Sequence, residues 1–233
     1  MTARVLVVIP AHDEQASLPG TLAEVRERAP FVDILVVDDG SHDDTTRVAR
    51  AAGVTAVRHP VNLGVGGALQ TGFRWAVRHG YDIVVQLDAD GQHDPGYLEA
   101  LLAPVVAGRC DVSIGSRFVS STGYRAPWNR RLGMLLFSGV VGLALGRPIY
   151  DTTSGFRAYA RRVMEVCQYD FPKDFPDAPL LISLARHGFR LEEVPVVMRV
   201  RTAGQSFYTL GKQLYYPYKN LLASLMALIR KPV

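Results

Sequence analysis

The first half of the chain alternates between short runs of apolar, β-branched residues and longer segments in which apolar residues recur every three or four positions. The short runs predict buried strands, and the longer segments predict amphipathic helices. The predicted strands are residues 4–10, 33–37, 54–58, 82–87 and 111–114, and the predicted helices are residues 14–28, 43–52, 68–79 and 96–106. Strands that alternate with helices at this spacing form right-handed βαβ units. The predicted fold class is therefore α/β, with a mostly parallel central sheet flanked by helices.

The second half of the chain has a less regular pattern. It contains an apolar run at 132–145, a polar loop at 151–157, a short helix at about 178–187, two strand-like runs at 190–194 and 196–200, and a C-terminal helix at about 211–230. No repeat, low-complexity tract or linker interrupts the sequence. We therefore expect a single domain over residues 1–233.

Charge is distributed unevenly between the two halves. Residues 1–108 carry 8 Arg against 14 acidic residues, whereas residues 109–233 carry 14 Arg and 4 Lys against 8 acidic residues. An acidic half beside a basic half suits a cation and nucleotide site that faces an anionic acceptor or a lipid surface. The basic residues are dispersed and match no nucleic-acid-binding module, so we expect no nucleic-acid partner.

The apolar segments favour contact with a membrane surface over passage through it. Residues 132–145 form the longest apolar run, which is shorter than the roughly 18 to 20 residues of a spanning helix. The run suits either a buried helix or an interfacial one, and so does the tyrosine- and leucine-rich run 215–229. The N-terminus lacks a signal-peptide pattern, and Cys110 and Cys167 lack metal-ligand spacing. We expect a cytoplasmic protein that can make peripheral contact with the cytosolic membrane face.

The most informative polar cluster is VVQLDADGQHD at residues 84–94. A predicted strand delivers Asp88 and Asp90 on a turn closed by Gly91, and Gln92 follows. Two carboxylates in such a turn can converge on one hard cation, and Mg²⁺ or Mn²⁺ prefers oxygen ligands and bridges to phosphates. The alternative is an ordinary turn, because Asp and Gly are turn residues. The position directly after a buried strand favours the cation site, since ligands of α/β sheets bind at the carboxyl ends of strands.

Two further clusters follow other predicted strands. In VVDDGSHDDT (36–45), Asp39 can accept hydrogen bonds from a ribose or a base, and Asp43 or Asp44 can cap the next helix. The segment NLGVGGALQTG (62–72) is glycine-rich, but Leu69 stands where a dinucleotide fingerprint has its third glycine. No Lys-Ser or Lys-Thr pair follows these glycines, so a phosphate-binding lysine loop is also excluded.

Six motifs in order carry a family resemblance: VVIPAHDE, VVDDGS, NLGVGGALQTGF, LDADGQHD, GSRF and DTTSGFR. Together they resemble the family 2 inverting glycosyltransferases, above all the branch of dolichol-phosphate mannose synthases and bacterial polyprenyl-phosphate sugar transferases. The resemblance covers nearly the whole chain. It implies a GT-A fold with a nucleotide-sugar-binding half at 1–115 and an acceptor-binding half at 116–233.

The resemblance also implies roles for individual residues. The implied donor-binding residues are Pro10, His12, Glu14, Val37, Asp39, Asp88, Ala89, Asp90, Arg117 and Arg201. The implied ligands of Mg²⁺ or Mn²⁺ are Asp88, Asp90 and Gln92, and the candidate acceptor contacts are Arg130, Arg131, Ser154, Arg157 and Ser206. The candidate catalytic residues are Asp88, Asp90, Arg117 and Asp177. For Arg117 and Arg201, the alternative to a phosphate contact is a solvated surface charge.

Three positions depart from the family pattern. His12 stands where relatives usually have tyrosine, and Phe207 stands where mannose synthases have lysine. Pro179 occupies the position of a family carboxylate, with Asp177 two residues earlier. A hydroxyl acceptor needs a general base, whereas a phosphate acceptor is already anionic near neutral pH. Asp177 can substitute for the missing carboxylate, so the identity of any base stays open.

The resemblance implies inverting, metal-dependent transfer of a hexose from a GDP- or UDP-sugar to polyprenyl phosphate. One alternative is transfer to a soluble hydroxyl acceptor, such as a glycan or a small metabolite. A second alternative is an inactive relative that acts as a binding module, against which the intact Asp88, Asp90 and Gln92 argue.

Overall fold

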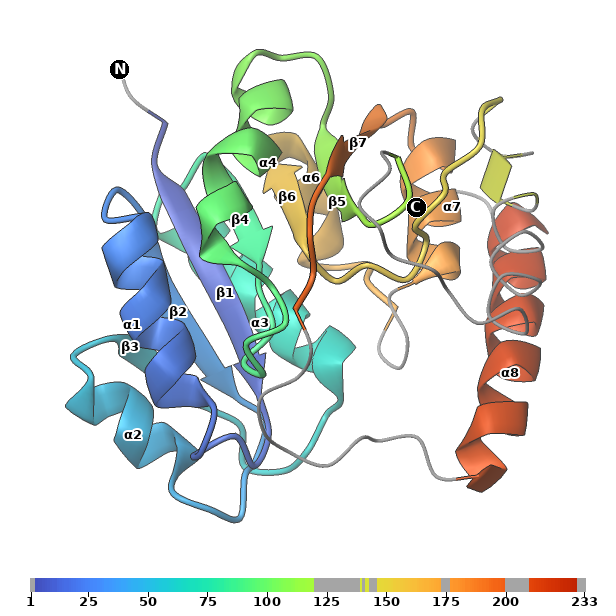
Figure 1. Cartoon of the computed structure of the whole chain (residues 1–233). Helices are drawn as coiled ribbons and strands as arrows, with labels where there is room; N and C mark the ends of the chain where they lie inside the picture. The colour runs from blue at the N-terminus through green and yellow to red at the C-terminus, as the bar shows by residue number, and fades with distance from the viewer. Residues whose placement is uncertain are drawn as a thin grey trace.

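A computed structural model gives the structure of the chain (Figure 1). It describes residues 3–119, 139, 141–142, 146–172, 177–199 and 210–229, and within the last segment the side chains from residue 219 onward. Arg130, Arg131, Arg201, Ser206 and most of the apolar run 132–145 lie outside the described residues.

A seven-stranded sheet in the order β3-β2-β1-β4-β6-β5-β7 forms the centre of the molecule. Its strands are β1 (Val5–Ala11), β2 (Asp33–Asp38), β3 (Thr55–Arg58), β4 (Ile83–Gln86), β5 (Val112–Ser116), β6 (Arg157–Ala160) and β7 (Leu191–Pro195). The first four strands pair in parallel, and β7 is parallel to β5. Only β6, between β4 and β5, is antiparallel to its neighbours within the described sheet. The predicted α/β class with a mostly parallel sheet is confirmed.

Helices cover both faces of the sheet. They are α1 (Leu18–Arg28), α2 (Thr45–Ala51), α3 (Val65–Arg78), the 3₁₀ turn η1 (Pro95–Tyr97), α4 (Leu98–Val106), α6 (Arg161–Cys167), α7 (Ala178–Arg186) and α8 (Leu210–Ile229). One core lies between the sheet and α3, α6 and α7, and the other lies beneath α1, α2 and α4. Within the described part of the chain, none of the helices combines the length and apolar character that crossing a bilayer requires.

Strand β1 illustrates why these apolar runs form central strands. Successive side chains of a strand point to opposite faces, so Leu6 and Val8 enter one core and Val7 and Ile9 enter the other. A strand buried on both faces reads as a continuous apolar run. Helix α3 lies very close to this strand, because a Cβ atom at Gly72 would be 2.5 Å from Val8 Cγ1. Glycine at this position therefore permits the approach.

One prediction for the second half of the chain is wrong, and two elements there were not predicted. The predicted loop 151–157 runs into strand β6, and helix α6 follows directly; neither element was predicted. The apolar–polar alternation is hidden there because Arg157, the first residue of β6, is itself buried. The predicted strand 196–200 is not a strand over its described residues, since only Met198 forms an isolated bridge, with His93. That segment leaves the sheet after β7 to run beside the turn that follows β4.

Candidate active site

The polar clusters gather where β1, β2 and β4 end, at one edge of the sheet (Figure 1). The loop after β1 is tied to the loop after β2, because the backbone N–H of Asp39 donates to the Ala11 carbonyl at 2.8 Å. Parallel strands bring their carboxyl ends together in this way. The placement predicted for these motifs is therefore confirmed.

The turn after β4 presents oxygen ligands. The Asp88 side chain is 37% exposed, whereas Asp90 is 7% exposed, and Asp90 Oδ1 accepts a hydrogen bond from the Gln92 N–H at 3.0 Å. Gly91 supplies the left-handed conformation of the turn, with φ of 76°. Gln92 Nε2 faces the Arg199 carbonyl at 3.5 Å, which leaves the amide oxygen for another partner. An oxygen-only donor set of two carboxylates and an amide fits Mg²⁺ or Mn²⁺.

His93 holds the base of this turn, a role that was not predicted from the sequence. The ring is buried and stacks on Phe156, with centroids 5.0 Å apart. His93 Nδ1 accepts a hydrogen bond from the Asp88 N–H at 3.0 Å, and Nε2 lies 3.6 Å from Asp88 Oδ2. An acceptor at Nδ1 places the proton of the neutral ring on Nε2, facing the carboxylate. The single sequence signal that could have indicated this role is a histidine inside the turn motif.

The loop before β6 lies against the same carboxylate. A Cβ atom at Gly155 would be 3.2 Å from Asp88 Oδ2 and 2.9 Å from Gln86 Nε2, so a side chain at this position would crowd the site. Ser154 and Arg157, both predicted acceptor contacts, are buried. Ser154 Oγ accepts a hydrogen bond from the Phe156 N–H, and Arg157 Nη2 donates to the Thr152 carbonyl. In the structure both side chains support the loop; their contact with an acceptor stays a prediction.

Arg117 is held by a buried carboxylate. Its Nε and Nη2 atoms donate to the two oxygens of Asp151 at 2.8 and 2.7 Å, and its backbone N–H donates to Asp151 at 3.0 Å. The Asp151 side chain is 0% exposed. A bidentate guanidinium–carboxylate pair fixes the plane of the arginine. The alternative of a freely solvated Arg117 is therefore wrong, while its contact with phosphate stays a prediction.

The segment after β7 contacts the turn that follows β4 through Arg199. The Arg199 N–H donates to the Gln92 carbonyl at 2.9 Å. Its guanidinium pairs with Glu24 of α1 and with Asp94, each at 2.8 Å. Sequence patterns did not indicate Arg199, because its partners lie 105 or more residues away along the chain.

The carboxylate of Asp39 is engaged inside the protein. It accepts hydrogen bonds from His59 Nδ1 at 2.7 Å, from the Leu63 N–H at 2.9 Å and from the Gly64 N–H at 2.7 Å. His59 continues the chain of contacts to Thr71 Oγ1 at 2.9 Å. Asp39 therefore anchors the glycine-rich segment that precedes α3, which explains the place of that segment beside the site.

Of the other residues predicted to contact the donor, two are half-buried and three are buried. His12 is half-buried and donates from Nδ1 to the Asp39 carbonyl at 3.0 Å, and Pro10 is also half-buried. Glu14 is buried and bonds to Ser17. Val37 and Ala89 are buried, so their side chains belong to the cores, and the Ala89 carbonyl accepts a hydrogen bond from Thr21.

Asp177 lies at the start of α7, facing α8. Asn220 Nδ2 of α8 is 3.5 Å from Asp177 Oδ2, and Pro179 is buried in the first turn of α7. This position joins two helices of the second half. The role of Asp177 as a base stays a prediction.

Comparison with known proteins identifies the family. The model described as glycosyl transferase family 2 matches residues 6–167. An undecaprenyl-phosphate mannosyltransferase of Micrococcus luteus is 37% identical over 213 residues, covering 87% of this chain and 86% of the relative. A polyprenol monophosphomannose synthase of Mycolicibacterium smegmatis is 36% identical over 220 residues, covering 88% and 81%.

The fold matches a solved glycosyltransferase. Glucosyl-3-phosphoglycerate synthase of Mycobacterium tuberculosis, solved in complex with Mn²⁺ and uridine-diphosphate-glucose, superposes with a TM-score of 0.71 at 21% identity, covering 99% of this chain and 80% of that one. This likeness confirms the GT-A fold. With its ordered motifs, its fold and its similarity to these relatives, the chain belongs to glycosyl transferase family 2 and is a glycosyltransferase.

Proposed function

We propose that this glycosyltransferase transfers a hexose, with inversion, from a GDP- or UDP-sugar to a polyprenyl phosphate. The observation that carries the proposal is the similarity, over more than four fifths of the chain, to two enzymes named for polyprenyl-linked mannose transfer. Both names carry mannose, so mannose is the first sugar to test. The donor is assigned to the half at 1–115 and the acceptor to the half at 116–233.

The turn after β4 is the proposed centre of donor binding. Asp88, Asp90 and the Gln92 amide oxygen would hold Mg²⁺ or Mn²⁺, which supplies Lewis-acid stabilisation of the leaving diphosphate when bound. His93 keeps the Asp88 backbone in place, and Arg199 keeps Gln92 in place. Because these contacts within the protein fix the turn, the carboxylates need little reorganisation during the reaction.

The acceptor assignment agrees with the chemistry at the start of α7. A phosphate oxygen is already a nucleophilic anion near neutral pH, so its attack on the anomeric carbon needs no proton removal. The buried Pro179 at the family carboxylate position is compatible with such an acceptor. Arg117, held by Asp151, offers a positive charge whose direction is fixed by a bidentate pair.

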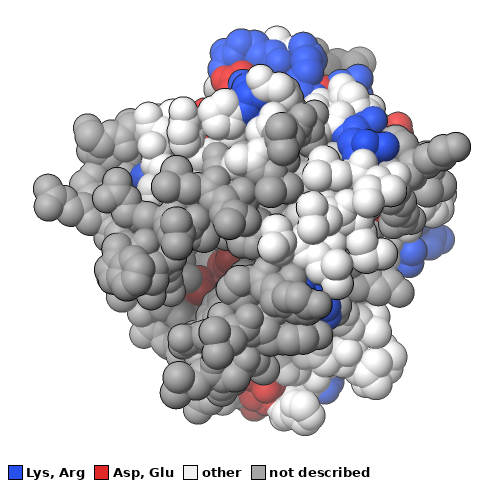
Figure 2. All heavy atoms as spheres, turned by 90° about the vertical axis from the view of Figure 1, so that its right-hand side faces the viewer, with Lys and Arg blue, Asp and Glu red and all other residues white. Residues whose placement is uncertain are grey.

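We also propose that the enzyme works at the cytosolic face of a membrane, where α8 contacts lipid. Leu222, Leu225, Met226 and Ile229 are exposed at positions i, i+3, i+4 and i+7 of this helix, and so form one apolar stripe. Asn220 and Ser224, on the buried side, face the protein. Figure 2 shows the side of the molecule on which α8 lies: among the described side chains, uncharged ones lie to the right of its centre, and Lys and Arg lie along its upper edge. An exposed apolar stripe of this kind suits an interfacial helix.

The test is transfer of radiolabelled sugar from a panel of GDP- and UDP-sugars into organic-extractable polyprenyl phosphate, with Mg²⁺, Mn²⁺ or a chelator. Label that enters the lipid phase, and that is lost when chelator is added, supports the proposed donor, the lipid acceptor and the requirement for a divalent metal. Turnover with soluble hydroxyl acceptors and none with polyprenyl phosphate would contradict the lipid acceptor and favour the soluble alternative.

A further inference from the structure

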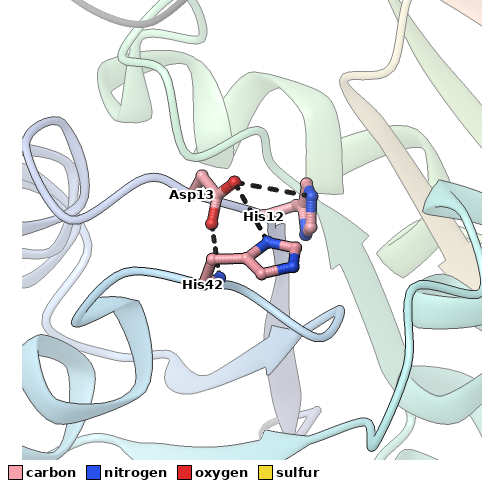
Figure 3. Close-up of side chains that lie close together, drawn as sticks. All are labelled: His12, Asp13 and His42. Carbon is pink, nitrogen blue, oxygen red and sulfur yellow. Dashed lines mark hydrogen bonds and ion pairs between the residues drawn. The ribbon is translucent and has the colours of Figure 1, made fainter.

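A second group of metal-ligand side chains lies apart from the turn after β4. One ring nitrogen of His12, one of His42 and one carboxylate oxygen of Asp13 all lie within 4.8 Å of one another. Figure 3 shows the Asp13 carboxylate beside both rings, with His12 and Asp13 in the loop after β1 and His42 in the loop after β2. Asp13 Oδ2 is 3.6 Å from His12 Nε2 and 3.8 Å from His42 Nδ1.

The geometry points to a site for Zn²⁺ or a similar borderline divalent ion, held by His12, Asp13 and His42, at the rim of the candidate nucleoside pocket. Zinc binds imidazole nitrogen and carboxylate oxygen at about 2.0–2.2 Å, so ligand atoms around a tetrahedral ion are roughly 3.4 Å apart. The separations of 3.6 and 3.8 Å are within a few tenths of an ångström of that value, and the two ring nitrogens lie within 4.8 Å of each other. Two imidazoles and one carboxylate favour Zn²⁺ over Mg²⁺, which prefers oxygen alone.

The tautomer of His12 is set for metal binding. Its Nδ1 lies 3.0 Å from the Asp39 carbonyl oxygen, which can only accept, so Nδ1 carries the proton. The neutral ring then presents the lone pair of Nε2 toward Asp13. A ligating histidine commonly donates its other N–H to a backbone carbonyl in this way.

The Asp13 carboxylate is also directed by the backbone. The His42 N–H donates to Asp13 Oδ1 at 2.7 Å, which leaves Oδ2 toward the two rings. Asp13 itself has φ of 55°, the one positive φ of a non-glycine residue among the described residues. That conformation turns the side chain into the gap between the loops.

Hydrogen bonds between the two loops hold the ligands in register. The Asp13 N–H donates to Ser41 Oγ at 3.0 Å, and the Glu14 N–H donates to Thr45 Oγ1 at 2.9 Å. The Gln15 N–H donates to Asp43 Oδ2 at 3.1 Å. Ligands fixed by such outer contacts lose little entropy when an ion binds. With three protein ligands, the ion would keep one open position for water or another ligand.

Co²⁺ is the probe for this site, because tetrahedral Co²⁺ absorbs strongly in visible light and octahedral, all-oxygen Co²⁺ absorbs weakly. Titration of the full chain with Co²⁺ in excess Mg²⁺ is expected to give an intense band that saturates at one equivalent and disappears when Zn²⁺ is added. Asp90→Ala is expected to keep the band, since that residue belongs to the other site. The proposal is overturned if wild-type protein gives no band, or if Asp90→Ala abolishes it.

His42→Ala is the sharpest variant. The His42 side chain is 88% exposed, so its removal leaves no cavity, and its backbone N–H still orients Asp13. We expect Co²⁺ affinity to fall by at least about tenfold, the lower end of what loss of even an outer-shell partner costs. His79→Ala, which removes an exposed histidine at the end of α3, is the matched control and should leave affinity unchanged. Equal affinity in wild-type and His42→Ala protein overturns the site.

A consequence for donor binding rests on the proposed function. Since His12 and the Asp39 backbone belong to the candidate nucleoside pocket, an ion at this site would obstruct the base. Zn²⁺ is then expected to raise the KM for the nucleotide sugar in wild-type enzyme and to have a smaller effect in His42→Ala. An unchanged KM at saturating Zn²⁺ contradicts this consequence, whereas the Co²⁺ band decides the site independently of any activity.

Discussion

His93 accepts a hydrogen bond from the backbone N–H of Asp88 at 3.0 Å while its ring stacks on Phe156. The contact links the first carboxylate of the candidate metal site to the loop before β6. A buried neutral imidazole thus determines where a surface carboxylate lies.

His93→Phe should therefore keep the stacking and lose the hydrogen bond. We expect kcat/KM to fall by about 10- to 100-fold, because displacement of reacting groups by about 1 Å has effects of this size. The free energy of unfolding should fall by about 1–2 kcal/mol, since a backbone N–H loses its acceptor. Transfer kinetics and urea unfolding measure the two effects. His79→Phe, at an exposed site, should change neither; activity retained in full by His93→Phe would contradict a positioning role.

Asp90→Ala should abolish metal-dependent transfer while leaving the fold intact. The side chain lies in the turn after β4, outside both apolar cores, and its Oδ1 accepts a hydrogen bond from the Gln92 N–H. Loss of a Lewis acid worth several kcal/mol predicts a fall in kcat of at least about 100-fold. Circular dichroism checks the fold, and assays with Mg²⁺, Mn²⁺ and chelator check the metal. An Asp90→Ala protein with full activity would show that the metal assignment is wrong.

Asp151→Ala should destabilise the protein strongly. It removes the fully buried partner of Arg117 and leaves a guanidinium that is itself mostly buried. Loss of one partner of a buried ion pair costs about 3–5 kcal/mol, measurable by urea unfolding. Asp44→Ala is the matched control, because the Asp44–Arg47 pair is exposed and its loss should leave the free energy of unfolding nearly unchanged. If the two variants lost similar amounts of unfolding free energy, burial would not be the reason why the Arg117–Asp151 pair stabilises the protein.

The apolar stripe of α8 gives a direct test of membrane contact. Met226→Asp should reduce co-sedimentation with anionic phospholipid vesicles by about tenfold or more, because burial of one large apolar side chain is worth about 1.5–3 kcal/mol. Val106→Asp alters an equally exposed apolar residue at the end of α4 and is the control. Unchanged vesicle binding by Met226→Asp would remove α8 from the lipid interface.

Acid should destabilise the protein partly through Asp38. Burial alone would raise the pKa of this carboxyl, but hydrogen bonds from Ser41 and Thr46 outweigh burial and lower the pKa below the usual 3.8. A folded pKa below the unfolded one stabilises the protein above pH 3.8, and this stability is lost as pH falls through the folded pKa. Urea unfolding of the wild type and of Asp38→Asn between pH 7 and pH 3 measures this contribution to the free energy of unfolding. The difference between their free energies of unfolding should shrink below about pH 4. A difference that stays constant with pH would contradict this contribution of Asp38 to stability.

Much of the fold follows from local pattern. The strands β1 to β5 and the helices between them were predicted because apolar residues repeat with the period of a strand or a helix. The turn at Asp88 and Asp90 was predicted because Gly91 and its neighbours have the chemistry of a turn that follows a buried strand. The order of the motifs along the chain also indicated the family, and the match to the family 2 model confirms it.

Strand β6 and the contacts of the site depended on the tertiary structure. Arg157 begins a buried strand, so the apolar pattern that reveals other strands is absent. Arg199 and the Arg117–Asp151 pair were not predicted, because their partners come from distant elements, and the stacking of His93 on Phe156 likewise joins separate elements. Local periodicity determines which segments become strands and helices. The partners of buried polar groups are decided only when the sheet order brings separate loops together, because each such group must then find its hydrogen bonds inside the protein.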